Sequence, residues 1–162
     1  AAAAYNADEK ELCRLDEIYS AVKTPFEIRS GSEKVTRRFF KICNNGRESF
    51  TGLYKSLTEQ GICKGHQCIA YGLYMRDNGI ELSEGLAVYG YSICSAIVTN
   101  CVKLVPLSQL AGQKILGESF ELISSASEKA LFTDINDIGI SGAGFDLRAM
   151  QHERLYSRQY MS

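Results

Sequence analysis

The chain has 162 residues, the size of one domain that can bury a hydrophobic core without disulfides or metals. Its 18 basic and 19 acidic residues leave a formal net charge of −1, so no overall field attracts nucleic acid or anionic lipid. The six cysteines include no Cys-x-x-Cys pair, and the first residues lack the basic start and apolar run of a signal peptide, so we expect reduced thiols and a cytoplasmic protein.

Helices are expected throughout, because apolar residues recur at three- and four-residue spacing and only two prolines occur. The pattern predicts a single all-α domain over residues 1–162, a bundle of about six to eight helices. The first helix ends at Thr24-Pro25, and its apolar stripe consists of Leu12, Leu15, Ile18 and Val22. The second covers residues 26–43, with Gly31-Ser32 as a point where it could break, and buries Phe39, Phe40 and Ile42.

Turn residues delimit the next two helices. Asn44-Asn45-Gly46 precedes a helix that carries Phe50 to Leu57 and ends at Gln60-Gly61. A helix over residues 66–75 follows and is stopped by Asp77-Asn78-Gly79.

The stretch from Gly85 to Val102 contains no charged residue and is close to the length that spans a bilayer. Its small and polar residues favour a different structure, a buried helix at the centre of a soluble bundle. They include Ser92, Ser95, Thr99 and Asn100. No contact with a membrane is therefore expected.

The last third of the chain contains two predicted helices and a loop. Val105-Pro106 ends the uncharged helix, because proline disfavours helical geometry in the residue before it. Ser108 caps one long helix that runs to about Phe132. Glycine, asparagine and aspartate make residues 133–145 a flexible loop, and Asp146 caps a last helix that continues as a partly flexible docking tail over residues 146–162.

The tail interleaves arginines with aromatic side chains. Chain ends usually fray and carry polar residues, so this composition predicts docking onto a protein surface. The candidate contact residues are His152, Arg154, Tyr156, Arg158 and Tyr160.

Cys63, His66 and Cys68 form a cluster of soft ligands, and thiolate with imidazole suits zinc or nickel. A fourth ligand is missing nearby, so we expect no bound metal and no cofactor. A helix start with two partly buried thiols explains the cluster better. His66 or His152 at a subunit contact could still bind metal weakly across a dimer.

No catalytic set is visible, since there are two histidines, no Gly-x-Ser-x-Gly and no carboxylate pair placed against His or Ser. Residues 37–41 are basic and aromatic, but helical spacing turns the phenylalanines inward, which favours a solvated helix face over a nucleic-acid patch. Gly139, Gly142 and Gly144 follow no strand and are expected to be linker. An exposed Arg154 or Arg158 could act in trans on a nucleotide enzyme, or could pair with a carboxylate.

Three stretches carry a family resemblance: Asn-Cys-Val-Lys-Leu-Val-Pro-Leu-Ser-Gln over residues 100–109, Gly-Gln-Lys-Ile-Leu over 112–116, and Met-Gln-His-Glu-Arg-Leu-Tyr-Ser-Arg over 150–158. They resemble the urease accessory protein UreF family, and the tail through Tyr160-Met161-Ser162 is most similar to the Helicobacter-type members. The Phe-Pro-x-Gly-like and Ser-x-Gly-Leu-Glu motifs with which UreF chains normally begin are absent. The chain thus resembles an N-terminally truncated member, the C-terminal two-thirds of the family.

The resemblance implies a non-catalytic all-α protein that forms a homodimer, joins the accessory protein UreD (UreH in Helicobacter) and recruits the GTPase UreG, which delivers nickel to apo-urease. It implies that the tail orders on UreD/UreH through Gln151, His152, Tyr156, Arg158 and Tyr160. It also implies conserved core and interface positions near the dimer and UreG at Tyr71, Gly72, Asn100, Lys103, Pro106, Gln109, Gly112 and Gln113. A scaffold for urease maturation is therefore expected, with a regulator of UreG and a Cys/His metal carrier as alternatives.

Overall fold

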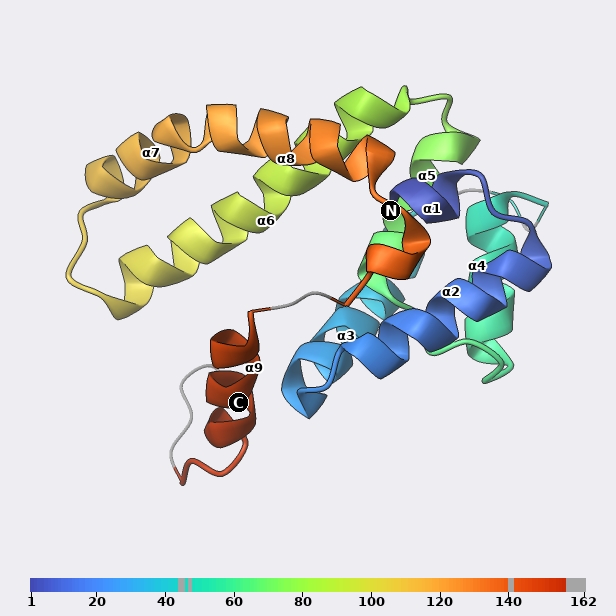
Figure 1. Ribbon diagram of the computed structural model, residues 1–162, viewed down its shortest axis with the longest axis horizontal. Helices are drawn as coiled ribbons and strands as arrows, with labels where there is room; N and C mark the ends of the chain where they lie inside the picture. The colour runs from blue at the N-terminus through green and yellow to red at the C-terminus, as the bar shows by residue number, and fades with distance from the viewer. Residues whose placement is uncertain (44–45, 47, 140–141, 157–162) are drawn as a thin grey trace.

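The computed structural model describes residues 1–43, 46, 48–139 and 142–156. These residues contain helices and no strand, which confirms the predicted all-α class. A compact half, at the right of Figure 1, consists of α1 (Ala2–Tyr5), α2 (Glu9–Val22), α3 (Phe26–Ile42), α4 (Phe50–Glu59) and α5 (Gln67–Asp77). An arm extends from it and consists of α6 (Leu82–Leu104), α7 (Gln109–Glu118) and α8 (Phe120–Phe132). A 3-10 turn (Ile135–Asp137) follows, and α9 (Ala143–His152) lies beside α3.

The hydrophobic core lies in the compact half. Its buried side chains include Leu12, Leu15, Phe40, Tyr54, Leu57, Ile69 and Leu73. Leu12, Leu15 and Phe40 confirm the expected apolar positions, whereas Ile42 is 81% exposed, so its predicted burial is wrong. Two residues advance about 200° around a helix, so Phe40 and Ile42 cannot share the buried face.

Two of the predicted helices differ from the structure in their interior. α3 continues through Gly31 without a break. The helix expected from Ser108 to Phe132 is two helices, which meet at Ser119. Ser108 caps the first as predicted, since its Oγ accepts from the Ala111 N–H at 3.1 Å.

The segment between α8 and α9 is partly ordered against the core. Ile135, in the 3-10 turn, packs on the core cluster. α9 begins after Gly142, so Asp146 lies in the first turn of the helix instead of at the cap. A carboxylate in the first turn still interacts favourably with the helix dipole. The predicted turn residues Asn44 and Asn45, the loop residues 140–141 and the tail residues 157–162 lie outside the described residues.

The prediction that the uncharged helix is buried at the centre of a bundle is wrong. Only Gly85 and Leu86 of α6 are fully buried, at the end of the helix where α5 contacts it. Along the rest of α6, where α7 and α8 pack, the described residues are exposed or half-buried. α6 is the one described helix long and apolar enough to cross a membrane, and only 11% of that apolar stretch is buried. Gly90 lies on the packed side, where a Cβ would lie 3.0 Å from Ile123 Cγ2 of α8, whereas Ser92, Thr99 and Asn100 are exposed.

Candidate partner-binding site

α9 and the residue after it are fastened to the N-terminal end of α3. Phe26 is the first residue of α3, where backbone N–H groups lack intrahelical acceptors, and Pro25 supplies no side-chain cap. The Phe26 N–H instead donates to Glu153 Oε1 at 2.8 Å. His152 Nδ1 lies 2.6 Å from Oε2 of Glu27. These contacts hold α9 beside α3, as Figure 1 shows.

The tail residues that the structure describes are all at least partly exposed: Gln151, His152, Arg154 and Tyr156. No residue of α9 is buried, and its apolar side chains Phe145 and Leu147 face solvent. Arg158 and Tyr160 lie outside the described residues. The described residues from α9 to Tyr156 therefore present aromatic and apolar groups that a protein partner could cover.

The motif residues of the arm gather at the turn between α6 and α7, a part of the molecule that Figure 1 shows as separate from α9. The exposed ones are Asn100, Lys103, Pro106, Gln109 and Gln113. Gly112 is buried, and a Cβ there would lie 2.6 Å from Val102 Cγ2 and 3.3 Å from Val98 Cγ1. Gly112 thus permits the close approach of α7 to α6, which fixes the turn. Among the described residues, the structure does not bring this arm tip and residues 146–156 of the tail together into one site.

Tyr71 and Gly72 lie on α5 at the junction of the compact half with α1 and α6. The Tyr71 ring centroid is 4.9 Å from that of Tyr89 on α6 and 6.4 Å from that of Phe39 on α3. A Cβ at Gly72 would clash with the Ala1 carbonyl oxygen. These two residues therefore join helices within the molecule and offer little surface to a partner.

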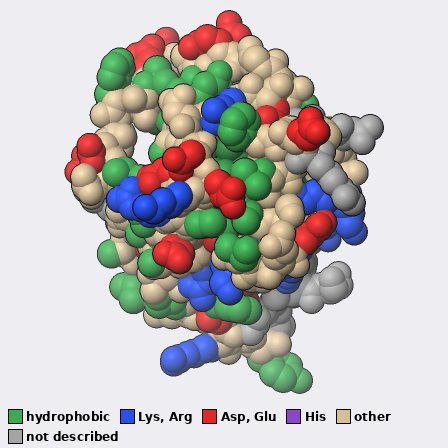
Figure 2. Space-filling model, turned by 90° about the vertical axis from the view of Figure 1, so that its right-hand side faces the viewer, with side chains coloured by type: hydrophobic (Ala, Val, Ile, Leu, Met, Phe, Trp, Pro, Cys, Tyr) green, Lys and Arg blue, Asp and Glu red, His purple; other side chains and the backbone are tan. Residues whose placement is uncertain are grey.

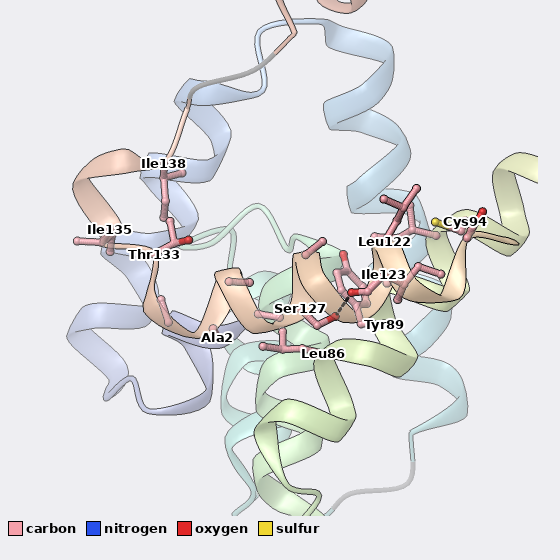
Figure 3. A pocket seen from close by; sticks show the side chains of 17 residues that line it. Ala2, Leu86, Tyr89, Cys94, Leu122, Ile123, Ser127, Thr133, Ile135 and Ile138 are labelled. Carbon is pink, nitrogen blue, oxygen red and sulfur yellow. Dashed lines mark hydrogen bonds between the residues drawn. The ribbon is translucent and has the colours of Figure 1, made fainter. Parts of the chain in front are cut away.

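A cavity of about 640 Å³ lies between α1, α6 and α8, and Figure 3 shows its lining. The wall is mainly apolar and includes Leu86, Leu122, Ile123, Ile135 and Ile138, which are labelled in Figure 3. The Ser127 hydroxyl donates to the Ile123 carbonyl at 2.8 Å, and burial raises the pKa of Tyr89 far above its ordinary value. The described lining contains no Asp, Glu, His, Lys or Arg. The cavity is lined mainly by apolar groups and can hold an apolar group.

The arm exposes large apolar side chains. Leu110 on α7 is 81% exposed, and Leu122 and Phe132 on α8 are 73% and 88% exposed. On α6 the exposed apolar residues are Val88, Tyr91, Ile93, Ile97 and Leu104. These three neighbouring helices therefore expose large apolar side chains that are available for contact with a protein or a membrane. On the opposite side of the molecule, Figure 2 shows acidic and basic side chains interspersed with apolar ones.

The candidate metal ligands Cys63, His66 and Cys68 are not arranged around a common point. His66 is fully buried, and its Nε2 lies 2.7 Å from Ser20 Oγ, while its buried Nδ1 has no hydrogen-bond partner. Burial lowers the pKa of His66, so its imidazole is neutral at neutral pH. Cys63 Sγ lies 3.8 Å from Cys13 Sγ instead of approaching His66. In the described part of the chain, no three His, Cys, Asp or Glu side chains come together as metal ligands.

Asp16 is a buried residue that the sequence-based predictions miss, and it is 3% exposed. Its Oδ2 accepts from the Tyr54 hydroxyl at 2.6 Å and from the Gly65 N–H at 3.0 Å. Its Oδ1 accepts from the Lys64 N–H at 2.7 Å, and the Tyr54 hydroxyl accepts from the His66 N–H at 2.8 Å. This network fastens the loop before α5 to α2. The available signal is an aspartate at a position where helical spacing calls for an apolar residue.

Comparison with known proteins gives consistent matches. The UreF family model matches residues 1–119. The urease accessory protein UreF of Actinobacillus pleuropneumoniae serotype 5b is 34% identical over 158 residues, which cover 97% of this chain and 70% of that protein. The UreF of Haemophilus influenzae is 35% identical over 153 residues, covering 93% of this chain and 65% of that protein. The UreF of Paenarthrobacter aurescens is 31% identical over 152 residues, covering 91% and 67%.

The fold and its surfaces define an all-α protein with two separate regions, the arm and the tail, that are exposed for contact with other molecules. The matches identify the family: the chain belongs to the UreF family of urease accessory proteins. The resemblance noted in residues 100–116 is thereby confirmed, and the matched family model ends before the tail.

Proposed function

We propose that the protein is a non-catalytic scaffold in urease maturation. It joins UreD/UreH and recruits the GTPase UreG, so that nickel passes to apo-urease within the assembled complex. It acts in the cytoplasm as a homodimer and needs no cofactor of its own.

The observation that carries this proposal is the separation of two exposed regions on one framework. The tail is anchored to α3 through His152 and Glu153, while the arm projects its apolar side chains elsewhere. A scaffold needs surfaces that are held apart so that two partners bind at once.

The two regions receive different partners in this proposal. The tail, through Gln151, Arg154, Tyr156 and the residues that follow, docks on UreD/UreH. The arm, with its motif residues around Lys103 and Gln109, serves the homodimer and UreG. Exposed Leu122 and Phe132 supply apolar area for such contacts.

Co-purification tests the tail assignment. The full chain and a variant ending at Ala149 are each tagged and purified with UreD/UreH, and circular dichroism checks that both are folded. We expect the full chain to retain UreD/UreH and the truncated chain to lose it. Arg148→Ala, which changes an exposed side chain of α9 before the truncation point, is the matched control and should retain binding. Binding by the truncated chain would overturn the assignment.

A second candidate is regulation of the UreG GTPase, since Arg154 is exposed at the end of α9 and one arginine can stabilise phosphate charge in trans. Under it, Arg154→Ala or Arg158→Ala abolishes a change in GTP hydrolysis and leaves partner binding intact. If the substitutions abolish partner binding instead, the scaffold proposal is supported, and the arginines are not assigned a role in regulating GTP hydrolysis.

A further inference from the structure

Two thiols from distant parts of the chain are in contact. Cys13 lies within α2, and Cys63 lies in the loop between α4 and α5, at a separation of 50 residues. Their Sγ atoms are 3.8 Å apart. Among the described residues, no other two cysteine sulfurs are in contact.

We propose that Cys13 and Cys63 form a reversible oxidation site, at which a low-molecular-weight disulfide converts the two thiols into an intramolecular disulfide. The site is separate from the tail and the arm, and it does not depend on the scaffold role.

The local structure holds the two sulfurs close to bonding position. Asp16 lies three residues after Cys13, on the same side of α2, and accepts hydrogen bonds from the N–H groups of Lys64 and Gly65. Cys63 directly precedes Lys64, so these bonds fix the loop against α2 beside the thiols. A disulfide requires the sulfurs to close from 3.8 Å to about 2.05 Å, which needs a small side-chain and loop adjustment and no opening of the fold. Such proximity greatly favours an intramolecular step over a bimolecular one.

Exposure determines the order of the steps. Cys13 is partly exposed and can meet a dissolved disulfide, whereas Cys63 is 2% exposed. The Cys13 thiolate attacks one sulfur of the small disulfide RSSR, forms Cys13–S–S–R and releases one thiolate, which solvent protonates to RSH. Cys63 then gives its proton to solvent, attacks the Cys13 sulfur and releases the second RSH. The two protein thiols lose two electrons, and RSSR gains them.

Burial raises the pKa of Cys63 to about 12. Because a thiolate is the attacking species, the second step is the slower one at neutral pH. The Cys13–Cys63 disulfide closes a covalent loop that contains α3 and α4. Because this loop lowers the conformational entropy of the unfolded chain, the disulfide stabilises the fold. Thiol reductants reverse the reaction.

The test uses the reduced full chain and glutathione disulfide at pH 8 as the probe. Remaining thiols are alkylated in denaturant, then counted by intact mass and assigned by peptide mapping. We expect one linked peptide pair containing Cys13 and Cys63, with neither of these two cysteines alkylated, and no disulfide between any other two cysteines. Glutathione bound singly to another partly exposed cysteine does not affect this result. The melting temperature should be higher by roughly 5 °C. Dithiothreitol should restore all six thiols. Six alkylated cysteines after the probe, or a disulfide between other residues, would overturn the proposal.

Single substitutions test the order of the steps. Cys63→Ser should retain glutathione on Cys13, because no second thiol displaces it, and Cys13→Ser should leave Cys63 unmodified. Cys43→Ser, at the end of α3, is the matched control and should form the Cys13–Cys63 disulfide normally. Glutathione on Cys63 in the Cys13→Ser variant would contradict the order derived from exposure. Peptide mapping of the unaltered chain decides the disulfide itself, whether or not a variant folds.

Discussion

Replacing Asp16 by alanine removes the acceptor on which the loop before α5 depends. The carboxylate receives hydrogen bonds from the Tyr54 hydroxyl and from the N–H groups of Lys64 and Gly65. Both the Asp16 and Tyr54 side chains are buried, so water is largely excluded from the donors that the substitution leaves behind.

The expected loss of stability follows from the three donors that lose their acceptor. A buried donor without a partner costs roughly 1–3 kcal/mol, and entry of water into the space left by the carboxylate reduces the sum. We therefore expect Asp16→Ala to lower the free energy of unfolding by about 3–5 kcal/mol, a large part of the roughly 5–15 kcal/mol of a typical domain. Tyr54→Phe removes one donor and leaves the His66 N–H without its acceptor, so about 1–2 kcal/mol is expected.

Urea unfolding at pH 7, followed by circular dichroism, measures these differences. Glu17→Ala is the matched control, because Glu17 is the exposed neighbour on the same helix and should change stability by less than about 0.5 kcal/mol. A loss below about 1 kcal/mol for Asp16→Ala, with an unchanged dependence on urea, would refute the structural role assigned to the network.

Three further substitutions have defined outcomes. Gly112→Ala should lower the free energy of unfolding, measured with urea, by about 1–3 kcal/mol, since the new Cβ meets Val102. Gly117→Ala, in open space on the same helix, should be neutral or stabilising. Equal effects of the two substitutions would be inconsistent with the α6–α7 packing. Because burial lowers the pKa of His66, the unfolded state binds protons more readily, so stability should fall as pH drops below about 6.5. Urea midpoints at pH 7 and pH 5 should differ less in His66→Gln than in the unaltered chain, and an identical difference would exclude His66 as a source. His152→Ala removes the contact with Glu27, so amide hydrogen exchange in α9 should accelerate with little change in the urea midpoint; unchanged exchange would show that this contact does not hold α9.

The sequence predicts those features of the fold that depend on local pattern. Leu12 and Leu15 recur at helical spacing, and Ser108 provides a cap that is visible without knowledge of the fold. The same pattern cannot show which neighbours cover a helix. The uncharged composition of α6 was therefore compatible with full burial, although its outer side is exposed.

Features that join distant segments are the ones that the sequence does not predict. The contact of Cys13 with Cys63 and the hydrogen bonds of Asp16 to the loop before α5 arise only when α2 and that loop meet. The candidate partner-binding site likewise has features that the sequence predicts and features that it does not. Its residues could be named from the family resemblance, but the separation of the arm tip from the tail required the structure.

The proposed scaffold role is tested most directly by sedimentation velocity on a mixture of UreD/UreH, UreG and this chain. The account predicts that UreG sediments with UreD/UreH only when the chain is present, in one complex that contains all three proteins. Co-sedimentation of UreG with UreD/UreH to the same extent without the chain, or failure of the chain to enter the complex, would contradict it.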